Sequence, residues 1–221
     1  MDNTNNLKAL KDTWGNIYAE HGTDVPWSHQ GSIESGLPVI VKFLKERKVS
    51  SLLDYGAGSG HFAVALKEAL LIPRVFAADI TDGGADKKWL QQKGIEFILA
   101  NQPKEVGKEK FDAILCWSVL NHLNRDLREA FLGQFAEMLT DRGSLLISAH
   151  SSKDPRMCGD VSLNRFSNRT VYSMESFENE IEKHGFLMVA KANIDVKNVR
   201  CKKDKGSDPI RVFRYCFFDK K

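Results

Sequence analysis

The feature that most restricts the fold is the segment SSLLDYGAGSG at residues 50–60. An apolar run ends there in an acid and is followed by three glycines at alternate positions. Phe62, Ala65, Leu66 and Ala69 then recur on one helical face. This order of strand, glycine-rich turn and helix is the first half of a β-α-β unit, and it predicts a parallel sheet.

Apolar runs and helical periods alternate through most of the chain. Strands are predicted at 74–80, 95–101, 111–117 and 143–150, and helices at 7–18, 33–44, 85–94 and 127–138. Parallel neighbours need helical crossovers, whereas residues 185–194 and 210–218 have no helix between them and should pair as an antiparallel hairpin. The predicted fold is α/β: a doubly wound, mostly parallel seven-stranded sheet with helices on both faces and this hairpin at its C-terminal edge.

One long segment lacks any period. Residues 151–172 have Pro, Gly, Ser and Asn scattered through them, which predicts an irregular insertion of the kind that often carries function. Ser173 is then expected to cap a helix whose inner face is Met174, Phe177 and Ile181.

Composition and cysteine spacing narrow the class of protein. The 221 residues are 42% hydrophobic and 28% charged, as in a single globular domain. No apolar run approaches about 20 residues, and the start MDNTNNLKALKDTW is unlike a signal peptide, so we expect a cytoplasmic protein without membrane contact. The four cysteines form no Cys-x-x-Cys pair and the histidines have no metal-ligand spacing, so neither a metal nor a disulfide framework is expected.

Charge is distributed unevenly along the chain. Residues 191–221 contain ten Lys and Arg against four Asp, so this segment carries +6 and the remainder carries −3 of the net +3. Such a segment could bind a polyanion. Solvated strand ends are the favoured interpretation, because no basic run with interleaved aromatic residues accompanies the charge.

The spacing of the glycines is informative about a ligand. The dinucleotide fingerprint is G-x-G-x-x-G, whereas residues 54–60 read D-x-G-x-G-x-G. With this motif the chain resembles the class I, Rossmann-like S-adenosylmethionine-dependent methyltransferases. The resemblance continues through RVFAAD, IEFILAN, FDAILCWSVLNHL and RGSLLIS and covers about residues 33–221.

The resemblance implies S-adenosylmethionine as the cofactor and assigns parts to a single domain spanning residues 1–221. These parts are an N-terminal cap segment (1–32), a cofactor-binding half (33–150), a substrate-side insertion (151–172), and a C-terminal helix and hairpin (173–221).

The cofactor residues implied by the resemblance follow four strands. Asp79 is expected to accept hydrogen bonds from both ribose hydroxyls, with Asp82 as its rival and a helix N-cap as the structural alternative. Asn101 stands where the family usually has an Asp that accepts from the adenine amino group, although a turn-forming Asn is an equal interpretation. The expected set is Asp54, Gly56, Ala57, Gly58, Gly60, Asp79, Ile80, Asn101, Gln102, Trp117 and Ser118.

Methyl transfer from a sulfonium is an in-line displacement in which the protein mainly aligns the nucleophile and excludes water. No universal catalytic residue is required. A base is required only when the accepting atom starts protonated. The candidates are His122, His150 and Tyr55, each of which could equally be a packed or solvated side chain. Cys116 is expected to be a buried structural thiol.

A small-molecule methyl acceptor is predicted, because residues 1–32, 151–172 and 195–209 are left over to build a pocket. Trp14, Tyr18, Pro26 and Trp27 resemble the aromatic segment that closes over the cofactor in several small-molecule methyltransferases. The alternatives are an RNA or protein methyltransferase that uses the basic C-terminal region, and a non-catalytic cofactor-binding module. The sequence does not indicate an oligomeric state.

Overall fold

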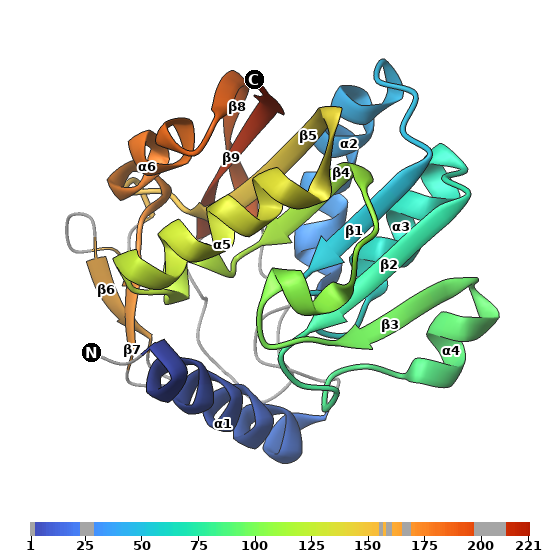
Figure 1. The fold of residues 1–221 in the computed structure, drawn as a ribbon. Helices are drawn as coiled ribbons and strands as arrows, with labels where there is room; N and C mark the ends of the chain where they lie inside the picture. Colours follow the sequence, from blue (N-terminus) through green and yellow to red (C-terminus); the bar gives the residue numbers. More distant parts are fainter. Residues whose placement is uncertain (1–2, 23–28, 155–156, 158–160, 165–168, 197–210) are drawn as a thin grey trace.

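Figure 1 shows the computed structural model, which describes residues 3–22, 29–154, 157, 161–164, 169–196 and 211–221. Its helices and 3₁₀ turns are α1 (Asn3–His21), α2 (His29–Lys45), α3 (His61–Leu70), α4 (Lys87–Gln92), η1 (Pro103–Val106), η2 (Leu120–His122), α5 (Arg125–Met138), η3 (Met174–Ser176) and α6 (Glu178–Lys183). Its strands are β1 (Ser51–Tyr55), β2 (Arg74–Asp79), β3 (Ile95–Leu99), β4 (Phe111–Trp117), β5 (Leu139–His150), β6 (Val161–Asn164), β7 (Arg169–Tyr172), β8 (Phe186–Val196) and β9 (Arg211–Lys220).

Seven strands form one sheet in the order β3-β2-β1-β4-β5-β9-β8. The first five are parallel, and β9 runs antiparallel to both β5 and β8. The predicted α/β sheet with its antiparallel C-terminal hairpin is therefore confirmed. Strand order reverses between β1 and β4, and open α/β sheets bind ligands beside such a point, at the carboxyl ends of the strands.

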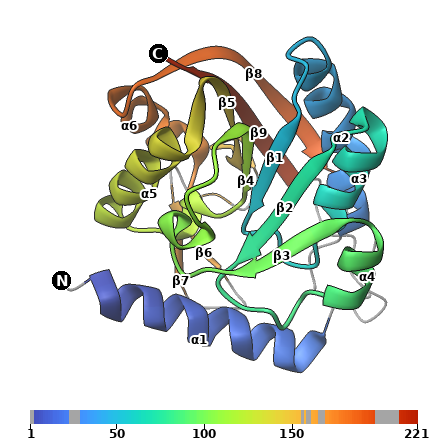
Figure 2. The same ribbon diagram turned by 45° about the vertical axis from the view of Figure 1, so that its right-hand side comes forward.

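Helices cover both faces of this sheet (Figures 1 and 2). On one face α2, α3 and α4 bury Ile40, Leu66 and Leu90, and on the other α5 and α6 bury Phe135 and Ile181. Because both faces are covered, the parallel strands read as apolar runs and do not alternate with polar residues. None of the helices in the described ranges combines the length and the apolarity that a membrane crossing requires.

Helix α1 lies across the carboxyl ends of the strands, apart from the two helical layers (Figures 1 and 2). Its Leu10 is buried with the core of the α5 face. Its Tyr18 packs on the loop after β2, where a Cβ added to Gly83 would lie 2.8 Å from Tyr18 Cβ and one added to Gly84 would lie 2.5 Å from Tyr18 Cε1. Contacts this short are not tolerated, so α1 sits this close because both loop residues are glycine.

Residues 151–172 are not wholly irregular, and this expectation was wrong. β6 and β7 form a small antiparallel sheet that pairs Val161 with Tyr172. Strands of four residues are too short to establish a period in the sequence, although β-branched residues such as Thr170 and Val171 favour extended backbone.

The helix predicted after Ser173 is interrupted. The turn η3 and the helix α6 meet at Phe177, whose φ of −132° is not helical, and the Ser173 side chain makes no capping hydrogen bond. Met174, Phe177 and Ile181 are all buried, which confirms the predicted inner face. The packing of these inward side chains thus holds the segment in place although its helix is interrupted at Phe177.

Gly84→Ala is expected to loosen α1, because the new Cβ would meet the Tyr18 ring. Overpacking of this kind costs about 1–3 kcal/mol, so amide hydrogen exchange over residues 7–18 should accelerate by about tenfold or more while the sheet stays protected. Gly133→Ala is the control, since a Cβ at Gly133 meets nothing within 4 Å. Equal protection of the α1 amides from hydrogen exchange in the two variants would contradict the dependence of the α1 packing on Gly84.

Candidate functional site

The glycine turn after β1 is shaped by left-handed backbone at three glycines. Gly56, Gly58 and Gly60 have φ of +78°, +54° and +76°, a region that favours glycine. The Gly56 and Ala57 N–H groups donate to Ala78 O at 2.7 and 3.0 Å, which ties the turn to β2. A Cβ on Gly56 would lie 2.1 Å from a Val119 methyl carbon. The turn therefore folds tightly between the ends of β2 and β4.

Asp79 ends β2 with its carboxylate against this turn. Its Oδ2 accepts from Gly58 N–H at 2.8 Å and its Oδ1 accepts from Thr81 N–H at 3.1 Å. Burial raises the pKa of Asp79 to about 6, although the backbone donors oppose the shift. Its rival Asp82 is half exposed and pairs with Lys87 at 2.6 Å. Of these two acids, Asp79 is the one bonded to the glycine turn.

Asp54 lies in β1 and is buried at 1% exposure. Burial and the nearby charge of Asp79 raise its pKa to about 7, while the Ala63 N–H in the first turn of α3 works against this shift. Its Oδ2 has no hydrogen-bond partner within the described part of the chain. A buried acceptor of this kind is costly unless a donor or a cation reaches it. The site thus suits a ligand that brings positive charge to the glycine turn.

Asn101 follows β3 and is fixed by Glu105 in η1. The Asn101 backbone N–H and Nδ2 both donate to Glu105 Oε2, at 2.8 and 3.0 Å. Because an ionised carboxylate can only accept, the atom of the Asn101 side chain that faces Glu105 is the amide nitrogen. The side-chain oxygen Oδ1 then points away from Glu105 and can accept a hydrogen bond. The neighbouring Gln102 accepts from Gln134 of α5 at 3.3 Å.

The end of β4 contributes strained backbone and an aromatic side chain. Ser118 has φ of +53°, which is rare for a residue other than glycine, and its N–H donates to Ser148 O at 2.8 Å. The Trp117 ring lies 4.6 Å from Phe62 and 4.8 Å from Tyr215. The indole is therefore packed on the α2 side of the sheet. The backbone of residues 117–118 turns at the edge formed by the carboxyl ends of the parallel strands, which is called the rim below.

The three candidate bases lie in different surroundings. Tyr55 is buried edge-on against Phe131 and Phe135, and burial raises its pKa well above the ordinary value. His122 meets Trp14 of α1 edge-on with 5.1 Å between ring centroids. His150 ends β5 with Nδ1 3.0 Å from Asp154 Oδ2. The thiol of Cys116 is fully buried, as expected.

Several polar partners at this rim were not found by sequence reasoning. Glu105 holds Asn101, Asp154 holds His150, and His61 contacts Ser59 Oγ at 2.7 Å. Glu105 and Asp154 each follow their partner by four residues, but Asn101 and His150 stand outside helices, where such spacing carries no signal. Residues 23–28 and 197–210, which include Pro26, Trp27 and much of the basic segment, lie outside the described residues.

Asp54→Asn should flatten the pH dependence of the free energy of unfolding. The folded-state pKa of about 7 lies above the ordinary 3.8, so the folded chain holds this proton more tightly than the unfolded chain does. The resulting stabilisation is complete below about pH 4 and is lost as pH rises through about 7.

Urea denaturation between about pH 5 and pH 8 measures this effect, with Asp82→Asn as the control because Asp82 is half exposed and ion-paired. As the pH rises over this range, the free energy of unfolding of the wild type and of Asp82→Asn should fall by similar amounts. That of Asp54→Asn should fall less. Parallel curves for the wild type and Asp54→Asn would contradict the raised pKa.

A family model described as Methyltransferase domain matches residues 33–191. The match includes the glycine turn and the ends of β2, β3, β4 and β5. No curated protein sequence matches the chain.

Solved structures share the fold at low identity. The 1,6-didemethyltoxoflavin N1-methyltransferase of Burkholderia thailandensis, solved with 1,6-didemethyltoxoflavin and S-adenosylhomocysteine, is 16% identical with a TM-score of 0.70, covering 100% of this chain and 91% of that one. The magnesium protoporphyrin IX methyltransferase of Synechocystis, solved with S-adenosylmethionine, is 16% identical (TM-score 0.59; 86% and 80% covered). The N-methyltransferase NodS of Bradyrhizobium japonicum, solved with S-adenosylhomocysteine, is 14% identical (TM-score 0.58; 86% and 90% covered).

Proposed function

The chain belongs to the methyltransferase domain family and is an S-adenosylmethionine-dependent methyltransferase, and we propose that its methyl acceptor is a small molecule. The position of α1 carries this proposal. Tyr18 packs on the loop after β2, and Trp14 meets His122 after β4, so the helix spans the rim on both sides of the glycine turn. A helix there obstructs a folded polymer but can enclose a small acceptor. The Burkholderia enzyme, matched over the whole of this chain, was solved with such an acceptor.

The residues at the rim fit the cofactor. Asp54 Oδ2 is a buried acceptor without a partner in the described chain, and the ammonium group of the cofactor would supply donors and charge. Asp79 has further lone pairs for the ribose hydroxyls, and Asn101 Oδ1 would accept from the adenine amino group. The remaining proposed contacts are Gly56, Ala57, Gly58, Gly60, Ile80, Gln102, Trp117 and Ser118.

When bound, the cofactor supplies a methyl group on a positively charged sulfur. The sulfur leaves as a neutral thioether, so the leaving group needs no proton from the protein. The chain's contribution is then to align the acceptor and to exclude water. Helix α1 is placed to exclude water. The left-handed Ser118, bonded to Ser148, fixes the backbone at the rim where the acceptor would be aligned.

An RNA or protein acceptor is the second candidate, because of the +6 charge in residues 191–221. Among the described residues of this segment, Lys191 and Arg214 form ion pairs with Glu178, and Lys220 forms one with Asp141. Paired cations contribute less to binding a polyanion than unpaired ones, which supports the small-molecule proposal.

Asp79→Asn should weaken binding of S-adenosylhomocysteine by about 1–3 kcal/mol in calorimetry, because an amide loses one acceptor and the charge that strengthens the others. Asp82→Asn is the matched control, and its affinity should stay at the wild-type value. A loss confined to Asp82→Asn would transfer the ribose role to Asp82.

Replacing Lys202, Lys203 and Lys205 together with Gln should leave S-adenosylhomocysteine affinity unchanged and should not alter turnover of a small acceptor. If the acceptor is a polyanion, the triple variant should instead lose activity, because binding to phosphates falls steeply with salt and with each lost cation. Total RNA and a small-phenol panel, assayed at low and physiological salt, separate the two. Methylation of RNA that collapses in the triple variant would replace the small-molecule proposal.

A further inference from the structure

We propose that the hydroxyl groups of Ser148 and Tyr215 form a polar subsite for the methyl acceptor, and that the acceptor is a planar molecule with a neutral carbonyl group that bonds to them. This inference rests on the proposed small-molecule function and names its acceptor class.

The Ser148 and Tyr215 hydroxyls are buried polar groups. Each residue is 1% exposed, and neither hydroxyl oxygen has a hydrogen-bond partner in the part of the chain that the structure describes. A buried hydroxyl of this kind is costly, because it has given up its bonds to water without gaining others. Two of them on neighbouring strands indicate a place where a ligand completes the bonding.

The two residues lie in one row of the sheet, at the rim. Ser148 of β5 pairs with Tyr215 of β9 on one side and with Trp117 of β4 on the other. Residues directly opposite one another point to the same face of a sheet, and Tyr215 belongs to the core on the α2 face. Ser148 O also accepts from Ser118 N–H at 2.8 Å. The row is therefore joined to the backbone at which the acceptor would be aligned.

Aromatic rings adjoin the two hydroxyls on this face. The centroid of the Trp117 ring is 4.8 Å from that of Tyr215 and 4.6 Å from that of Phe62. Phe213 follows at 6.2 Å from Trp117. Trp117 and Phe62 are partly exposed, so part of each ring stays accessible beside the buried hydroxyls. Rings at such spacings favour another planar ring next to them, which supports a planar acceptor.

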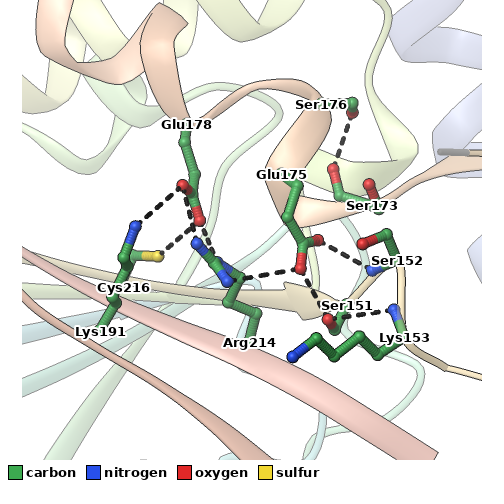
Figure 3. Close-up of polar contacts among 10 residues, drawn as sticks. All are labelled: Ser151, Ser152, Lys153, Ser173, Glu175, Ser176, Glu178, Lys191, Arg214 and Cys216. Atoms are coloured by element: carbon green, nitrogen blue, oxygen red, sulfur yellow. Dashed lines mark hydrogen bonds and ion pairs between the residues drawn. The ribbon is translucent and has the colours of Figure 1, made fainter.

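The backbone that carries Tyr215 is held from the opposite face of the sheet. Arg214 and Cys216 flank Tyr215 in β9, and Figure 3 shows both of them bonded to Glu178 of α6. Arg214 Nη2 donates to Glu178 at 3.0 Å and Cys216 Sγ donates at 3.4 Å. Because successive residues of a strand point to opposite faces, these contacts direct the Tyr215 ring toward α2. The hydroxyl is thus in place before a ligand arrives.

The chemistry of the two hydroxyls favours a neutral carbonyl group. Burial raises the pKa of Tyr215 above its ordinary value, so the phenol keeps its proton and can donate it to a hydrogen bond. The Ser148 hydroxyl also has a proton to donate. A carbonyl oxygen accepts such bonds without bringing a charge, whereas a buried carboxylate would bring a charge that neither hydroxyl neutralises.

Helix α2 covers the subsite at a point where its sequence weakens it. A Cβ added to Gly36 would lie 2.6 Å from Tyr215 Oη and 2.4 Å from Trp117 Cη2. Two residues further along, Pro38 lies inside the helix and has no N–H to donate to the preceding turn. Helices bend at such prolines, so we expect the first turns of α2 to move aside when the acceptor enters.

Binding of three planar bicyclic phenols by the full chain with S-adenosylhomocysteine present tests the subsite, in mildly acidic buffer where the phenols keep their proton. 7-Hydroxycoumarin carries a neutral carbonyl group, 2-naphthol carries none, and 6-hydroxy-2-naphthoic acid carries a carboxylate. In calorimetry the wild type should bind 7-hydroxycoumarin at least about tenfold more tightly than the other two. Tyr215→Phe and Ser148→Ala should each weaken this binding by about tenfold and change that of 2-naphthol by less than about twofold.

Ser144→Ala is the matched control. Ser144 lies on the same face of β5, at the other end of the strand, where its hydroxyl donates to Asp219 at 2.7 Å. This variant should lower the midpoint of urea denaturation and keep the wild-type affinity for 7-hydroxycoumarin. Tyr215→Phe and Ser148→Ala should instead keep or raise the midpoint, because each removes a buried polar group that makes no described hydrogen bond.

Equal weakening of 7-hydroxycoumarin and 2-naphthol in Tyr215→Phe and Ser148→Ala would assign the hydroxyls a structural role and overturn the proposal. Unchanged affinity for 7-hydroxycoumarin in both variants would overturn it too. The same holds for a wild type that binds none of the three compounds, binds them equally or prefers the carboxylate. Lower denaturation midpoints in the two variants would show that water or the chain already satisfies these hydroxyls, which also contradicts the subsite.

Calorimetry with S-adenosylhomocysteine alone separates the subsite from the proposed function. The wild type, Tyr215→Phe, Ser148→Ala and Ser144→Ala should bind it equally. A wild type that failed to bind S-adenosylhomocysteine would contradict the proposed function itself.

Discussion

The hydrogen bond from Gly58 N–H to the Asp79 carboxylate, 2.8 Å long, joins the two strand ends on which the rim depends. With the bonds from Gly56 and Ala57 to Ala78 O, it pulls the turn after β1 against β2 and sets where α3 begins. Left-handed backbone at three positions makes the arrangement dependent on glycine. Without this tie, neither Asp54 nor the end of β4 would converge on the same point.

The same packing buries two carboxylates, and in the described part of the chain Oδ2 of Asp54 has no hydrogen-bond partner. Burial raises the pKa of both Asp54 and Asp79, and the charge of one makes the other harder to ionise. The Tyr18 phenol, brought in by α1, lies near enough that Asp79 adds to the burial that raises its pKa. A cluster of this kind in the interior carries a cost that the proposed cationic, hydrogen-bonding ligand would offset on binding.

The layers of the fold could be predicted from the sequence because each parallel strand is buried on both faces and reads as one apolar run. The glycine turn and the acids at residues 54 and 79 were predictable because strand ends converge in any parallel sheet. The strands β6 and β7 were missed because four residues hold too little periodicity. Glu105 and Asp154 were missed because each reaches its partner through a turn whose geometry leaves no pattern in the sequence.

The claim that the buried Asp54 carboxylate receives the positive charge of S-adenosylmethionine is tested most directly by proton release. Calorimetry at about pH 6.5, in two buffers with different ionisation enthalpies, measures protons exchanged on binding. Since Asp54 is partly protonated at this pH in the free protein, cofactor binding should release a proton from the wild type and markedly less from Asp54→Asn. Equal heats in both buffers for the wild type, with undiminished affinity in Asp54→Asn, would contradict the account.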